Sequence, residues 1–198
     1  MRLGEWLASR EYITNKACVL TVGSDGLKPS QNNLMSIGLH TGKEHSITYI
    51  TGADPSAVVQ YTGVSPSSYT ERAVGADRAK ELILPILYSM DFYVVFNKAF
   101  VEGWLDDFDP KMFEDKEVLD LSSFFKLKDM GEDIPPDVEN LTDLNERISA
   151  CLVGTKYRKG YKLEDLQARY LGDMEDYLPA LEMKPLKLYK LYETALML

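Results

Sequence analysis

Residues 18–39 read CVLTVGSDGLKPSQNNLMSIGL, and the fold of the chain is organised around this stretch. It begins with an apolar, β-branched run at 19–22, breaks at Gly- and Pro-rich residues 23–30, and resumes with a second apolar run at 34–39. Such runs, separated by Gly, Pro and Ser, are typical of two strands joined by a loop. SITYI at 46–50 alternates polar and apolar residues, so we expect a third strand and an antiparallel meander.

The chain after this meander is mostly helical in pattern. Asp54 followed by Pro55 predicts the start of a helix that ends near Tyr61. An apolar stripe at helical spacing then predicts one helix over 68–90, kinked by Pro85. The other expected elements are a short helix at Leu3–Ser9, a buried strand at 92–96, a helix at 98–105, a strand or strand-to-helix passage at 118–125, a long loop at 128–140, and helices at 141–153, at 162–171 and from there to 198.

Three antiparallel strands, a helical crossover, a buried strand and covering helices predict a mixed α/β fold with a ribonuclease-H-like layout. A chain of 198 residues is long enough for one domain with a full core. We therefore expect a single domain over 1–198, with an N-terminal extension at 1–16 and a loop insertion at 128–140.

The composition is that of an ordinary globular protein, with 45% hydrophobic and 27% charged residues. No apolar run approaches the roughly 20 residues that a membrane helix needs. We expect a cytoplasmic protein without membrane contact.

Cys18 and Cys151 are predicted to be reduced core thiols rather than a disulfide. His40 and His45 lack cysteines at zinc-ligand spacing and are interpreted as ordinary side chains near strand ends.

The net charge of −9 argues against broad binding to a phosphate backbone, which depends on clustered Lys and Arg. The densest basic run is Lys156, Tyr157, Arg158 and Lys159. This aromatic and basic patch fits single-stranded nucleic acid. A solvated loop before a helix explains it equally well. Both interpretations remain open.

Five segments have counterparts, in this order, in one family of nucleic-acid enzymes: TVGSDGL at 21–27, LMSIGL at 34–39, YTGVSP at 61–66, VVFNKAFVEGWL at 94–105, and KLEDL at 162–166 with YLG at 170–172. On these segments the chain resembles the DnaQ-like, or DEDD, 3′-to-5′ exonucleases, from about residue 18 to residue 198. The resemblance implies a ribonuclease-H-like fold.

The reaction of that family uses carboxylates that hold two divalent metal ions. The resemblance puts the first Asp on Thr21, the Glu on Gly23, the second-motif Asp on Val101, and the third-motif Asp on Met183 or its neighbour Glu182. Val and Gly side chains offer no oxygen ligands to a hard cation. The resemblance thus implies degenerate motifs, no catalytic residue and no metal site.

Nearby acids are the alternative source of metal ligands. Asp25 follows the first strand, and Asp106, Asp107 and Asp109 follow the second motif by a turn or more. A shift of several residues along a helix moves a side chain to another face, so these acids fit the metal positions poorly. Asp120 is interpreted as a structural strand-end residue.

The expected function is that of a catalytically inactive, exonuclease-like binding module without a cofactor, with a protein involved in nucleic-acid metabolism as the main candidate partner. Two alternatives stay open. One is an active exonuclease that uses Mg²⁺ or Mn²⁺ at an atypical site. The other is a non-cleaving binder of single-stranded nucleic acid, with Asn97 and Lys98 beside the 156–159 run as candidate contacts. Degenerate motifs also hint at a viral origin, with the host cytoplasm as the location.

Overall fold

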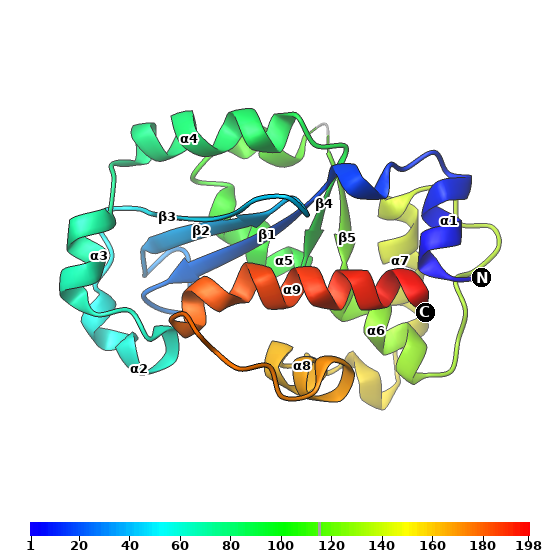
Figure 1. Ribbon diagram of the computed structural model, residues 1–198. Helices are drawn as coiled ribbons and strands as arrows, with labels where there is room; N and C mark the ends of the chain where they lie inside the picture. Colours follow the sequence, from blue (N-terminus) through cyan, green and yellow to red (C-terminus); the bar gives the residue numbers. More distant parts are fainter. Residues whose placement is uncertain (115) are drawn as a thin grey trace.

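The computed structural model describes residues 1–114 and 116–198. Within these residues a five-stranded mixed sheet has the strand order β3-β2-β1-β4-β5 (Figure 1). β1, β2 and β3 form the expected antiparallel meander, and β4 and β5 add to it in parallel with β1. The strand bounds are Ala17–Ser24 for β1, Leu34–His40 for β2, His45–Tyr49 for β3, Phe92–Val95 for β4 and Glu117–Asp120 for β5.

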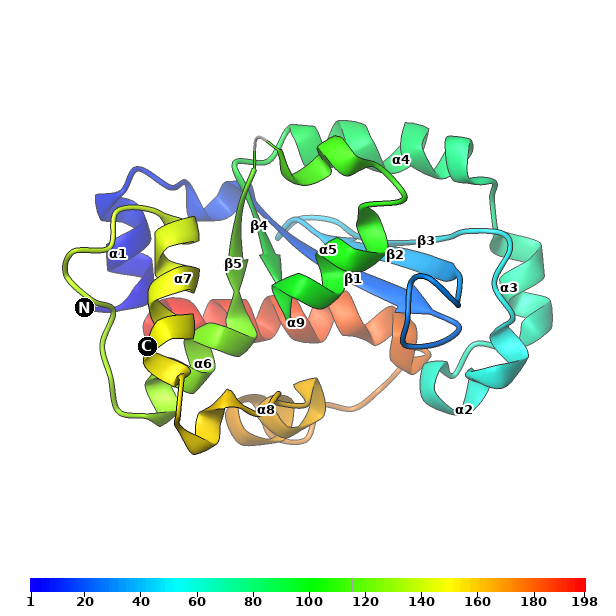
Figure 2. The same ribbon diagram turned by 180° about the vertical axis from the view of Figure 1, so that it is seen from behind.

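Alternation along β1 divides the core into two layers. Ala17 and Val19 pack into a cluster with α1 (Leu3–Ser9), α6 (Leu121–Asp129), α7 (Leu141–Leu152) and α9 (Ala180–Met197). Cys18, Leu20 and Val22 point to the opposite face, into a cluster with α4 (Ala76–Tyr88) and α5 (Lys98–Leu105). Figures 1 and 2 show α9 along one face of the sheet and α5 on the other.

The meander, the buried strand over Phe92–Val95, and the helices at α1, α5, α7, α8 (Leu163–Leu171) and α9 confirm the sequence predictions. Residues 118–125 contain the end of β5 and the start of α6, so the strand-to-helix interpretation is confirmed. His40 ends β2 opposite His45 at the start of β3, also as expected. Among the helices that the structure describes, none combines the length and apolar character that a bilayer crossing requires.

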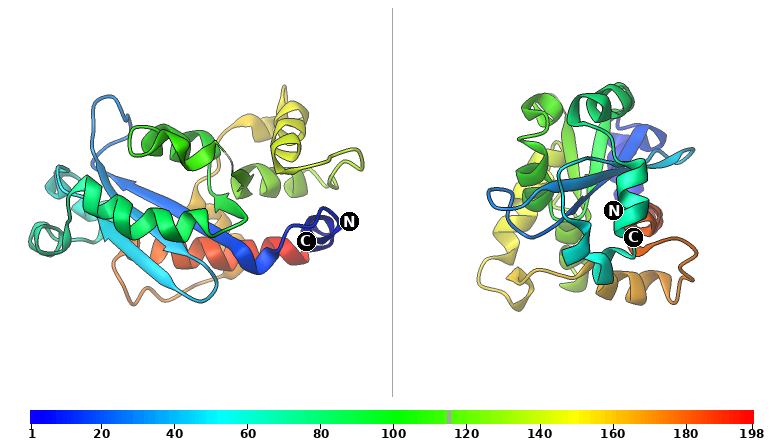
Figure 3. Two further views of the ribbon diagram at one scale, coloured as in Figure 1. Left: turned by 90° about the horizontal axis from the view of Figure 1, so that it is seen from above. Right: turned by 90° about the vertical axis from the view of Figure 1, so that its left-hand side faces the viewer.

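The predicted single helix over 68–90 is wrong, because two helices occupy this region. α3 (Pro66–Arg72) begins at Ser65, whose side chain accepts a hydrogen bond from the Ser68 amide. It ends where Val74 pairs with Ile50 in an isolated parallel bridge, and α4 starts two residues later. Figure 3 shows the two helices as separate segments. The extended bridge at Val74 interrupts a pattern that is helical on both sides.

Two further predictions need correction. The helix expected from Asp54 is a 3₁₀ turn over Pro55–Ala57 followed by the short α2 (Val59–Thr62), which ends at Gly63 with φ of 68°. Both cysteines are free thiols, but only Cys18 is in the core, and Cys151 is exposed on α7. Burial raises the pKa of the Cys18 thiol to about 12, so this group stays protonated.

Candidate functional site

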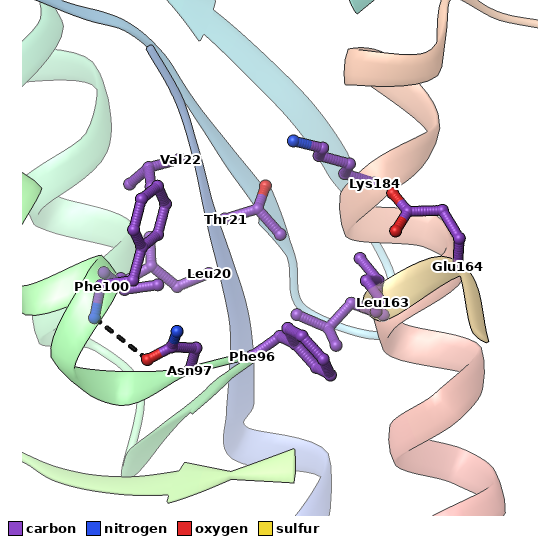
Figure 4. Close-up of a pocket in the computed structure, with 11 residues that line it drawn as sticks. Leu20, Thr21, Val22, Phe96, Asn97, Phe100, Leu163, Glu164 and Lys184 are labelled. Atoms are coloured by element: carbon purple, nitrogen blue, oxygen red, sulfur yellow. Dashed lines mark hydrogen bonds between the residues drawn. The ribbon is translucent and has the colours of Figure 1, made fainter. Parts of the chain in front are cut away.

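A cleft of about 160 Å³ opens at the carboxyl ends of the parallel strands β1 and β4 (Figure 4). In open α/β sheets this edge, where the order of the strands reverses direction, is the usual place for ligands. Thr21 and Val22 come from β1, Asn97 and Val101 from the start of α5, and Lys184 from α9. The other lining residues are Leu20, Phe96, Phe100, Leu163, Glu164 and Leu188.

The corner between β4 and α5 is fixed by hydrogen bonds at Asn97. The Asn97 backbone has φ of 64°, a left-handed conformation that Asn tolerates better than most residues. Its side-chain oxygen accepts from the Phe100 amide and caps α5. The Asp120 carboxylate accepts from the amides of Asn97 and Lys98, and also from the Ser122 amide at the start of α6. Asp120 thus has the structural role that the sequence predicted.

Thr21 and Gly23 lie on the α9 side of β1, where side chains have little room. The Thr21 hydroxyl donates a 3.4 Å hydrogen bond to the carbonyl of Gly38 on β2. A Cβ atom placed on Gly23 would lie 2.5 Å from Ser36 Oγ and 2.6 Å from Leu181 Cδ1 of α9. Carbon atoms do not approach this closely, so Gly23 is the residue that lets α9 pack on β1.

On α9, Lys184 and Leu188 line the cleft. Met183 is fully buried and does not line the cleft. Glu182 points to the β3 side of the sheet, where its carboxylate accepts hydrogen bonds from Tyr49 Oη and from Arg72. Burial alone would raise the pKa of Glu182, but these hydrogen bonds outweigh it and hold the pKa below its usual value. Glu182 is therefore an ionised structural residue that ties α9 to α3 and β3.

The Lys184 side chain extends from α9 toward β1, and the Glu164 side chain of α8 is drawn beside its base (Figure 4). Burial among apolar side chains lowers the pKa of Lys184, and the Glu164 carboxylate partly offsets this effect. Within residues 1–114 and 116–198, no hydrogen bond or ion pair engages its ammonium group. The cleft therefore contains a half-buried cation that makes no direct hydrogen bond or ion pair, with Glu164 as its nearby carboxylate.

These residues do not fit a pair of divalent metal ions. Hard cations need several oxygen ligands, and two-metal sites need carboxylates that face each other. The positions facing this cleft carry a Thr hydroxyl that is already hydrogen-bonded, a Val and an ammonium group, with Glu164 as the carboxylate. No group of three or more His, Cys, Asp or Glu side chains in the described part of the chain could hold a metal ion.

The neighbouring acids stay outside the cleft. Asp25 accepts hydrogen bonds from the Asn33 amide, the Asn33 side chain and the Asp54 amide, and so holds the loop between β1 and β2 to the 3₁₀ turn. Asp106 and Asp107 line separate surface hollows beyond α5. None of these three residues lines the cleft.

The candidate nucleic-acid residues divide into two groups in space. Asn97 lines the cleft, and Lys98 beside it pairs with Glu102 on α5. Lys156, Tyr157 and Arg158 form a 3₁₀ turn that ends at Lys159, and the three basic residues are exposed. The chain then runs into α8, whose first residues, Leu163 and Glu164, line the cleft. The basic run is thus sequentially close to the cleft but does not line it.

Lys184 and Glu164 were not predicted as site residues. Glu164 lies in the segment 162–166 that resembles the family, and Lys184 directly follows Met183, to which the resemblance assigns the third-motif Asp. That neighbourhood was the available clue. A shift of one residue on a helix rotates a side chain by about 100°, so the facing position depends on a register that the sequence left open.

The sheet order and the two helical layers define a ribonuclease-H-like α/β fold. Among solved structures, the chain is similar to Escherichia coli exonuclease I in complex with a dA16 oligonucleotide, with a TM-score of 0.55, 13% identity and 90% of this chain covered. It is also similar to a product-bound exonuclease I, with a TM-score of 0.56, 12% identity and 90% coverage. A third similar structure is a complex of ExoI with SSB-Ct, with a TM-score of 0.53, 13% identity and 91% coverage.

At this level of identity the similarity shows the fold alone. The chain spans 40%, 43% and 42% of the length of those three chains. No family model matches the sequence. No curated protein matches it either.

Proposed function

We propose that this chain is a non-catalytic binding domain built on an exonuclease fold, with a protein as its partner. One observation supports this proposal: Thr21 and Val101, to which the resemblance assigns metal-binding carboxylates, line a cleft that is otherwise mostly apolar, with Lys184 as its cation and Glu164 as its carboxylate. Without several oxygen ligands, no divalent metal is held in position to activate water or stabilise a leaving oxygen. A fold persists without its original chemistry because packing, not the site, stabilises it.

A protein partner agrees with the charge of the chain. The net charge of −9 disfavours a long contact with phosphates, which releases counterions only where several cations line the path. Apolar side chains such as Leu27 and Tyr61 are instead 83% and 72% exposed beside the cleft. Exposed apolar surface that lines a hollow is typical of protein contacts.

A nuclease assay tests the absence of catalysis. The full chain is incubated with an end-labelled single-stranded oligonucleotide and Mg²⁺ or Mn²⁺, with exonuclease I as a positive control. We expect no release of mononucleotides above the buffer control, and no heat of Mg²⁺ binding by titration calorimetry. Metal-dependent release that a chelator abolishes would overturn the proposal in favour of an active exonuclease with an atypical site.

A second candidate function is binding of single-stranded nucleic acid without cleavage. The observation that favours it is the exposed basic run at 156–159, which precedes the helix that borders the cleft. A similar structure, exonuclease I, is in complex with a dA16 oligonucleotide. The two candidates differ in the surface that binds and in the response of binding to salt.

A further inference from the structure

A second hollow, of about 470 Å³, adjoins the cleft and is termed the groove. It shares three lining residues with the cleft, namely Val22, Phe100 and Lys184. Its volume lies in the range of ordinary ligand sites. The cleft and the groove are thus adjoining hollows with the Lys184 side chain on the boundary between them.

Apolar side chains dominate the groove, and two of them are held out toward solvent. Leu27 extends from the loop between β1 and β2, and Tyr61 from α2. Val58 and Leu181 complete the apolar lining. Large apolar side chains at this level of exposure are stabilised by contact with another apolar surface, which removes them from water.

The Lys184 ammonium adds one positive charge to this apolar surface. The ammonium group is half-buried and makes no direct ion pair, so an incoming anion that pairs with it offsets part of the cost of its burial. The Glu164 carboxylate lines only the cleft side, and no other charged residue lines the groove. The groove therefore suits a ligand that combines apolar groups with a single negative charge.

On this basis we propose that the groove binds an apolar peptide segment of a partner protein, with one carboxylate of that segment paired to Lys184. This inference rests on the proposed binding function. A nucleic-acid strand fits less well because it has a negative charge at every nucleotide, whereas the groove offers one cation. The peptide's apolar side chains cover Leu27 and Tyr61, and its carboxylate enters beside Phe100.

A peptide array tests this pairing. The probes are acetylated and amidated hexapeptides of Leu, Phe, Trp and Pro with one Asp at each position in turn, and matched peptides with Asn replacing Asp. We expect a subset of Asp peptides to bind the full chain more than about tenfold better than their Asn counterparts, as for other buried charge pairs. Equal binding of Asp and Asn peptides, or no binding to any, would overturn the inference.

Four variants locate the contact. Lys184→Met keeps the length of the side chain and removes its charge, so it should abolish the preference for Asp. Leu27→Ser and Tyr61→Ser alter exposed side chains and should each weaken binding several-fold without unfolding the chain. Lys43→Met, which removes an exposed lysine at the turn between β2 and β3, should change nothing. Retention of the Asp preference in Lys184→Met would contradict the proposal.

The peptide experiment and the nuclease assay can fail independently of each other. If the chain releases mononucleotides with Mg²⁺, the non-catalytic proposal fails whatever the peptides show. If there is neither cleavage nor a preference for Asp, only the peptide inference fails. If an oligo(dT) competes with the peptides at equal affinity, the groove takes nucleic acid, and the peptide inference is wrong.

Discussion

Gly23 shows at the level of one residue why a side chain has no room between β1 and α9. Ser36 Oγ of β2 and Leu181 Cδ1 of α9 occupy the space of a Gly23 side chain. A carboxylate at this position would require both neighbours to move. The absence of a side chain at Gly23 and the close packing of α9 are therefore linked.

Gly23→Ala is expected to lower the free energy of unfolding by about 1–3 kcal/mol, because the added methyl group overpacks the contact between β1 and α9. Urea unfolding followed by circular dichroism measures this. Gly160→Ala is the matched control, since a Cβ there meets nothing within 4 Å. A Gly23→Ala chain as stable as the control would mean that α9 lies farther from β1 than the structure places it.

The residue scale is also where the sequence was least informative. The sequence alone shows that positions 21 and 101 carry no carboxylate. It does not show which of Glu182, Met183 and Lys184 faces the cleft, because these three side chains point in directions about 100° apart. Only the packing of α9, set by contacts such as that of Glu182 with Tyr49, selects Lys184.

At the scale of elements, Asp120 joins two strand-to-helix corners. Its carboxylate accepts from backbone amides at the β4–α5 corner and from the Ser122 amide and Ser123 hydroxyl of α6. The same corner positions Asn97 and Val101 at the cleft. The shape of the cleft thus depends on a residue that does not line it.

Asp120→Ala should therefore cost about 2–4 kcal/mol of stability, from the loss of a helix cap and of buried hydrogen bonds to a charged group. Asp54→Ala, which removes a cap from an exposed 3₁₀ turn, should cost only about 1 kcal/mol. Chemical unfolding of both variants provides the comparison. Equal losses would show that the corner does not depend on Asp120.

Most elements were predictable because their patterns are local. The buried run over Phe92–Val95 and the apolar faces of α5 and α7 determine strand or helix without reference to the rest of the chain. The break between α3 and α4 was not predictable in this way. The break combines a long-range bridge between Val74 and Ile50 with Gly75, the N-cap residue of α4, and a single Gly within a helical pattern predicts a break only weakly.

At the scale of the whole molecule, the net charge and the local basic run favour different partners. The chain is acidic overall, with a net charge of −9, while the run at 156–159 is a local basic surface. The ribonuclease-H-like layout was predictable because a three-strand meander followed by a helical crossover leaves few arrangements. The function of the basic surface at 156–159 was not predictable, because a basic run has the same sequence whether it is solvated or binds a ligand.

Retention of a single-stranded oligonucleotide on the immobilised chain distinguishes these cases. Three exposed cations, Lys156, Arg158 and Lys159, can each contact one phosphate. Binding through them alone should weaken with salt by a slope of no more than about −2 in log–log form, given about 0.7 per contact on single strands. Retention should therefore be weak at low salt and absent near physiological ionic strength.

Reversal of these three residues to Glu should abolish any retention at low salt. Reversal of Lys28, Lys43 and Lys111, which are exposed at scattered positions, gives the same net charge and should leave retention largely intact. If both triple variants lose binding equally, overall charge and not the run governs the contact. A steeper salt slope would require further cations in the path, and no retention at low salt would exclude nucleic-acid binding and leave the groove as the binding surface.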